Sequence, residues 1–224
     1  LRLSMPRLDY LHGEYASLES LADRIAQELP YSFRKEGFVA AGNSLGALLA
    51  LCMGHVAERA VLIAPHVGTR FRFMGRGDKV FQRELARIFH DPHHLSPAQI
   101  ARYHGKWRDA TRNRKAFSRL RRLKAVIESF NPSPWFEQFQ ERLHMVCGRY
   151  DTLSPVEQLA GLKRSYPAMG FSVLPRCGHA VPLEQPARLA RILSRLNQPP
   201  LAMHREQVYA ARACERVQGD AARP

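Results

Sequence analysis

Three residues of this chain have the types and order needed for nucleophilic catalysis, and the first of them is a serine in a glycine-flanked turn. Ser44 stands in the sequence Gly-Asn-Ser-Leu-Gly at 42–46, after a strand-like apolar run and before a stretch of small apolar residues. A strand, a sharp turn and a buried helix of this kind expose a serine hydroxyl at the carboxyl end of a sheet. The helix start, beginning with the backbone N–H of Leu45, would face any oxyanion formed there. We expect Gly42 and Gly46 to be required because the two backbones pass too close for a Cβ.

An aspartate and a histidine follow later strand-like runs in the same way. Asp151 comes after the apolar run 143–147 and a glycine turn, and His179 comes after the short strand-like run 171–174 and Gly178. Taken singly, Asp151 could cap a turn and His179 could be a surface loop residue. As an ordered set behind three strands, the residues predict that Ser44, Asp151 and His179 converge as a catalytic triad.

Three segments resemble the alpha/beta hydrolase family, in particular its members with a helical cap. Residues 42–46 resemble the nucleophile elbow, 148–155 the acid loop, and 178–186 the histidine loop and the start of the last helix. The resemblance covers about residues 9 to 196.

The resemblance implies a role for each of the three residues. Ser44 would be the nucleophile, His179 the general base and later the general acid, and Asp151 the carboxylate that orients the imidazole. It implies hydrolysis of a small-molecule ester or thioester through an acyl-enzyme, without a cofactor. Carbon–carbon bond cleavage or a lyase reaction on the same scaffold stays open, and the acyl group is not specified.

The patterns along the chain predict an α/β-hydrolase fold with a mostly parallel sheet. We expect a helix over 17–29, a strand over 59–64, and helices over 155–165 and 186–196. Ser96 with Gln99 and Ser154 with Glu157 are read as capping boxes.

A change in composition and pattern along the chain predicts the domain organisation. We expect a discontinuous core of residues 1–67 and 136–200. Residues 68–135, rich in Arg, His and aromatic residues, would form a helical cap over the active site that excludes water and shapes the acyl pocket. Residues 201–224 are expected to be a loosely attached or disordered tail.

The beginning of the chain departs from the family pattern. Related enzymes have strands before the nucleophile, one followed by a His-Gly loop that donates the second oxyanion N–H. Here only 43 residues precede Ser44, and His12-Gly13 stands too close to the helix at 17–29 to be that loop. We therefore expect an N-terminally truncated hydrolase whose second oxyanion donor is missing, with poor esterase activity. The nucleophile strand would be an unpaired edge unless residues 1–8 or a partner chain cover it.

Composition favours a one-domain protein of the cytoplasm. The chain has 224 residues and 45% apolar content, no apolar run near the ~20 residues that span a bilayer, and no signal-peptide pattern. The four cysteines, Cys52, Cys147, Cys177 and Cys214, show no paired spacing, and Cys52 and Cys147 are expected in the core. A reduced compartment is the expectation that follows.

The net charge of +14 is concentrated in the segment between Arg102 and Lys124. A solvated helix is the interpretation we favour. The alternative is a surface that attracts an acidic carrier protein, an anionic substrate or a membrane surface. In that alternative the chain would be a catalytically impaired remnant or binding module that docks an acidic partner through its basic cap. No motif indicates binding of a nucleic acid.

Two histidine features remain. The cluster His90-Asp91-Pro92-His93-His94 is poorly spaced for one metal ion, because adjacent ligands separated by a proline do not converge, so no metal site is expected. His66 follows the strand at 59–64 and could line the pocket or belong to a loop.

Overall fold

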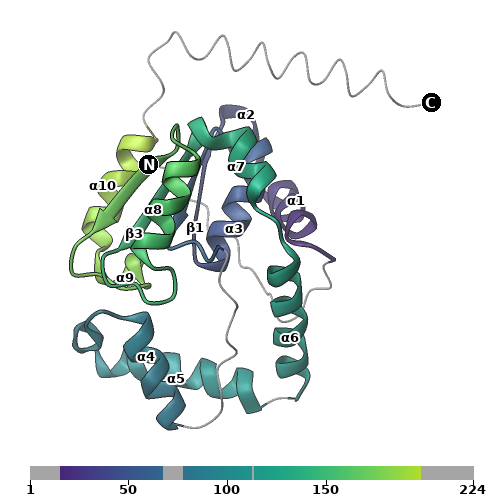
Figure 1. The fold of residues 1–224 in the computed structure, drawn as a ribbon. Coiled ribbons are helices and arrows are strands. Elements are labelled where there is room, and N and C mark those ends of the chain that lie inside the picture. The colour runs from purple at the N-terminus through teal and green to yellow at the C-terminus, as the bar shows by residue number, and fades with distance from the viewer. Residues whose placement is uncertain (1–15, 68–77, 113, 198–224) are drawn as a thin grey trace.

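A single parallel sheet organises the molecule (Figure 1). A computed structural model describes residues 16–67, 78–112 and 114–197 of the chain. The sheet has the order β1-β2-β3-β4, and each neighbouring pair is parallel. The strands are β1 (Val39–Asn43), β2 (Arg59–Ile63), β3 (Leu143–Gly148) and β4 (Gly170–Leu174). Since the strands run in the same direction, their carboxyl ends lie along one edge, where sites form in such sheets.

The connections between the strands are helical, as expected for an α/β-hydrolase fold. The helices are α1 (Leu18–Glu28), α2 (Tyr31–Glu36), α3 (Leu45–Cys52), α4 (Asp78–Ile88), α5 (Pro97–Arg112), α6 (Arg114–Ser129), α7 (Ser133–Phe139), α8 (Val156–Ser165), α9 (Val181–Glu184) and α10 (Pro186–Leu196). Short 3-10 turns lie at η1 (Met53–His55), η2 (Pro92–His94) and η3 (Gln140–Arg142).

Both faces of the sheet are buried. Along β2, Ala60 and Leu62 belong to an apolar cluster with residues of α1, α3 and α8, whereas Val61 and Ile63 belong to a second cluster with residues of α9 and α10. Alternate side chains of a strand point to opposite faces, so each face has its own layer of helices. Strands covered on both sides read as continuous apolar runs, which is why β2 and β3 could be recognised from the sequence.

The described part of the segment between β2 and β3 contains helices joined by short loops. No strand occurs in the described residues 78–112 and 114–139. Figure 1 shows α4 and α5 beside α9, with α6 leading back toward α7. An apolar cluster joins α4 and the following turn to the segment before α9, and its buried members are Phe81, Leu85, Phe89, Leu95 and Ala180.

The predicted helix starts are confirmed, and one predicted capping box is wrong. The Ser17 side chain caps α1, and Ser96 and Gln99 exchange side-chain-to-backbone hydrogen bonds at the start of α5. The capping box expected between Ser154 and Glu157 does not form. The Ser154 hydroxyl instead donates to the carbonyl of Ala64 at 3.4 Å, because Ser154 is buried against the end of β2 rather than exposed at a helix start.

The predictions for the two ends of the chain lie outside the described residues. Within those residues β1 has β2 as its one strand neighbour. The structure does not describe residues 1–8, which the sequence offers as a cover for the edge of β1. It also does not describe residues 201–224, which are expected to form a loosely attached or disordered tail. No helix in the described part of the chain is long and apolar enough to cross a bilayer.

Candidate active site

The backbone at Ser44 is bent sharply between β1 and α3. Ser44 has φ of 57° and ψ of −114°, a conformation that non-glycine residues rarely adopt and that costs roughly 1–3 kcal/mol. Its N–H donates to the carbonyl of Ile63 at 2.9 Å, which fixes the turn to the neighbouring strand. A Cβ on Gly42 would lie 1.9 Å from the carbonyl oxygen of Gly46, so Gly42 is required, as predicted.

The same prediction for Gly46 is wrong. A Cβ there would meet nothing within 4 Å among the described residues. The close approach to Gly42 is made by the carbonyl group of Gly46. One glycine of the pair is therefore needed for the bend, and the other occupies open space.

The first turn of α3 lies directly behind Ser44. Leu45 is its first residue, and the side chains from Ala47 to Cys52 are buried in the core. The N–H groups of a first helical turn have no partner within the helix. The positive end of α3 is therefore at Ser44, in a position suited to a negatively charged oxygen.

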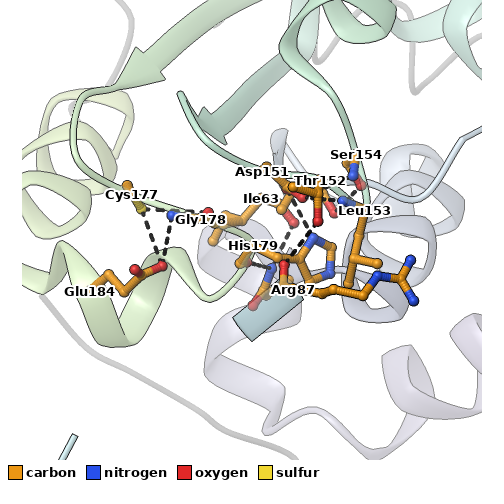
Figure 2. Close-up of polar contacts among 12 residues, drawn as sticks. Ile63, Arg87, Asp151, Thr152, Leu153, Ser154, Cys177, Gly178, His179 and Glu184 are labelled. Atoms are coloured by element: carbon orange, nitrogen blue, oxygen red, sulfur yellow. Dashed lines mark hydrogen bonds and ion pairs between the residues drawn. The ribbon is translucent and has the colours of Figure 1, made fainter. Parts of the chain in front are cut away.

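Asp151 holds two groups at once. Its Oδ1 accepts hydrogen bonds from the N–H groups of Leu153 at 2.8 Å and Ser154 at 2.9 Å, and its Oδ2 lies 2.9 Å from Nδ1 of His179. The side chain is fully covered. The two interpretations offered by the sequence, a turn-capping aspartate and a partner of His179, therefore both apply (Figure 2).

The bond to Asp151 determines what the His179 imidazole can do. A carboxylate only accepts hydrogen bonds, so Nδ1 must carry the proton and donate it. In the neutral ring the other nitrogen, Nε2, then holds a lone pair. The ring is 8% exposed and is fixed in orientation by this contact. This arrangement leaves Nε2 of His179 able to accept a proton.

Asn43 connects the His179 loop to the serine turn. Its Nδ2 donates to the carbonyl of His179 at 3.3 Å and to that of Ile63 at 3.1 Å. Asn43 immediately precedes Ser44, so these bonds bring the backbone of His179 against the turn. Asn43 is not among the predicted site residues, although an amide inside the Gly-x-Ser-x-Gly pattern at a strand end is a signal that the sequence contains.

Strained backbone gathers at this edge of the sheet. Among the described residues, the non-glycine positions with positive φ are Ser44, Ala64 and Arg176. They follow β1, β2 and β4, respectively. Such conformations persist only where the surrounding structure holds them, and they cluster at functional sites.

The neighbouring cysteines are not arranged as nucleophiles. Burial, followed by the charge of Asp151, raises the pKa of the Cys147 thiol to about 12. Burial, followed by the charge of Glu184, raises the pKa of the Cys177 thiol to about 12. A thiol needs to lose its proton to attack, so both remain inert near neutral pH. Cys52 is buried too, in agreement with a core role for Cys52 and Cys147.

Histidines also follow β2 and α4. His66 is half-buried after β2, and His90 and His93 are exposed near the end of α4. No group of three or more potential ligands among the described residues is placed to hold a metal ion.

Comparisons with known proteins agree on the fold. A model of the alpha/beta hydrolase family matches residues 4–192. No curated protein matches the chain in sequence. A bacterial membrane phospholipase A, described as a virulence factor, has a similar structure, with 17% identity and a TM-score of 0.64. That match covers 83% of this chain and 64% of the phospholipase, so this chain spans less than two thirds of its length.

Two further solved structures are similar over more of their own length. A thermophilic esterase is 17% identical, with a TM-score of 0.57, over 83% of this chain and 76% of the esterase. A meta-cleavage product hydrolase from Pseudomonas fluorescens IP01 is 20% identical, with a TM-score of 0.57, over 85% of this chain and 74% of that enzyme. At these identities the likeness concerns the fold.

Proposed function

This chain belongs to the alpha/beta hydrolase family, and we propose that it hydrolyses small-molecule esters or thioesters through an acyl-enzyme on Ser44. The observation that carries the proposal is the bond between Asp151 and Nδ1 of His179, on a loop tied to the residue before Ser44. Family membership supports hydrolysis, and the proposal adds the substrate class and the roles of the three residues.

In the proposed reaction His179 moves one proton at a time through Nε2. Ser44 Oγ attacks the substrate carbonyl carbon while its proton passes to Nε2. The oxyanion of the tetrahedral intermediate accepts a hydrogen bond from the Leu45 N–H, at the positive end of α3. Collapse of the intermediate expels the alcohol or thiol, which takes the proton from Nε2. Water then attacks the acyl group by the same route, releases the acid and restores Ser44.

Asp151 supports this cycle without taking the proton. Its Oδ2 keeps Nδ1 protonated and stabilises the imidazolium that forms in each half-reaction. Its Oδ1 is held by the N–H groups of Leu153 and Ser154, so the carboxylate does not need to reorient. A second oxyanion donor is not identified among the described residues; the family pattern would place it before α1, and residues 1–15 are not described.

We also propose that the helical segment within residues 68–135 is a cap over this site, inserted into a core formed by 1–67 and 136–200. The described helices α4 to α6 lie between β2 and β3, and the end of α4 contacts the loops that carry Asp151 and His179. Such a cap would exclude water from the acyl-enzyme except during hydrolysis.

A fluorophosphonate probe tests the proposal, because it reacts with serines activated by a neighbouring base. The wild-type chain should be labelled on the peptide that contains Ser44 and should hydrolyse p-nitrophenyl esters slowly, since a missing second oxyanion donor lowers the rate. Ser44→Ala should lose both properties, whereas the exposed control Ser165→Ala should keep them. A folded wild-type chain that is neither labelled nor active would refute the proposal and favour the non-catalytic alternative.

A further inference from the structure

The carboxylate of Glu184 joins two segments that are far apart in the sequence. Oε2 accepts from the Gly178 N–H at 2.7 Å and from the Cys177 thiol at 3.9 Å, beside His179 (Figure 2). Oε1 accepts from the N–H groups of His90 at 2.6 Å and Asp91 at 3.3 Å, which follow α4. One side chain therefore ties the histidine loop to the end of the first described helix of the cap segment.

The backbones of the two segments are also in direct contact. The carbonyl of Ile88, the last residue of α4, accepts from the N–H of His179 at 2.8 Å and from that of Ala180 at 3.2 Å. A Cβ on Gly178 would lie 2.7 Å from the His90 nitrogen and 2.8 Å from the Ile88 oxygen. This close approach leaves room for glycine alone and puts His179 against the carboxyl end of α4.

The loop that carries Asp151 meets the same end of α4. The Thr152 hydroxyl donates to the carbonyl of Arg87 at 3.2 Å. The ring of Tyr150 stacks on that of His90, with centroids 4.1 Å apart and planes 11° from parallel. The loop that carries Asp151 and the loop that carries His179 therefore both contact one short stretch, residues 87–91.

We propose that Glu184 is a positioning residue for His179, and that it acts by clamping the histidine loop to the end of α4. The inference rests on the proposed function, since it gives His179 its place in proton transfer. Glu184 does not touch the reacting atoms. Without it, three N–H groups, those of His90, Asp91 and Gly178, lose their carboxylate acceptor. The loop that aims Nε2 is then held by fewer contacts, and errors of about 1 Å cost up to 100-fold in rate.

The experiment compares Glu184→Ala and Glu184→Gln with Glu137→Gln, which changes an exposed glutamate on α7 in the same way. We expect Glu184→Ala to lower kcat by about 10- to 100-fold with KM changed less than about threefold. Glu184→Gln should fall between it and the wild type, since the amide keeps one of the two acceptor atoms. Glu137→Gln should behave as the wild type. A folded Glu184→Ala protein with unchanged kcat would overturn the inference.

A second measurement does not depend on activity. A proton on an imidazole nitrogen bonded to a carboxylate gives a strongly downfield NMR signal, assigned here by its absence in His179→Asn. That signal should broaden or disappear in Glu184→Ala and Glu184→Gln and persist in Glu137→Gln. If it persists in the folded Glu184 variants, the inference fails. Should the wild type show no hydrolase activity, the same signal still decides the positioning role, so the two failures can be distinguished.

Discussion

Replacing Asp151 with Asn should leave the fold intact and remove catalysis, because of how the two carboxylate oxygens are used. Oδ1 accepts from two backbone N–H groups, of Leu153 and Ser154, and Oδ2 accepts from His179. Asn has one acceptor oxygen, and the N–H groups of Leu153 and Ser154 can both bond to it, as they do to Oδ1. The amide nitrogen then faces Nδ1 of His179, which must become the acceptor. The proton moves to Nε2, and the imidazole can no longer take the proton of Ser44.

The expected loss follows from that change of tautomer. In a Ser-His-Asp triad the corresponding substitution lowers kcat by about 10⁴-fold, as measured in a serine protease. This corresponds to roughly 5.4 kcal/mol of transition-state stabilisation. The assay is kcat for a p-nitrophenyl ester together with the rate of fluorophosphonate labelling at Ser44. Asp109→Asn, an exposed aspartate on α5, is the matched control.

The result that would refute this reasoning is a folded Asp151→Asn protein with kcat within tenfold of the wild type. It would mean that His179 keeps its working tautomer without the carboxylate. A large drop in melting temperature in Asp151→Asn would instead show that the loop bonds of Oδ1 dominate. Because Asn has the same shape and can serve both loop N–H groups, we expect that drop to be small.

Three further predictions concern stability and coupling. Gly42→Ala should destabilise the chain by several kcal/mol in chemical denaturation, since its Cβ would lie 1.9 Å from a backbone oxygen. Gly46→Ala should be tolerated. Equal effects of the two substitutions would contradict the geometry of the turn at Ser44. Gly178→Ala should slow labelling of Ser44 by pushing the histidine loop away from α4, and an unchanged rate would argue against that contact. Burial, followed by neighbouring cations, lowers the pKa of His144 below 6.5, so the unfolded chain binds a proton that the folded chain excludes. The free energy of unfolding should therefore decrease as pH falls below about 6.5, and less so in His144→Gln; parallel pH profiles would contradict this.

The sequence was sufficient for the fold and for the order of the candidate residues, because both depend on local patterns. The runs around β2 and β3 are continuous and apolar, and the turn at 42–46 has a distinctive spacing. The error at Gly46 arose because a motif does not say which atom makes the close approach. The Ser154 error arose because a capping pattern looks the same whether its serine is exposed or buried against another strand.

The contacts of Glu184 with His90 and of Asn43 with His179 could not be predicted, because the partners are 94 and 136 positions apart in the sequence. No local period or spacing records such a pairing. Both side chains bond to backbone groups, and a backbone N–H or carbonyl carries no sequence signature. The sequence shows only that each polar residue lies within a recognised motif. This suggests a functional role but does not identify the residue that it bonds to.

A continuous series of hydrogen bonds connects the end of α4 to the serine turn through two carboxylates, each of which accepts hydrogen bonds through both of its oxygens. Glu184 links the end of α4 to Gly178, and Asp151 links His179 to its own loop. Asn43 then joins the His179 carbonyl to the turn that bears Ser44. Any displacement of α4 therefore reaches His179 by two routes, through the carbonyl of Ile88 and through Glu184. If α4 is displaced when a substrate binds, His179 should therefore be displaced with it, and the proposed proton transfer would depend on what binds against α4.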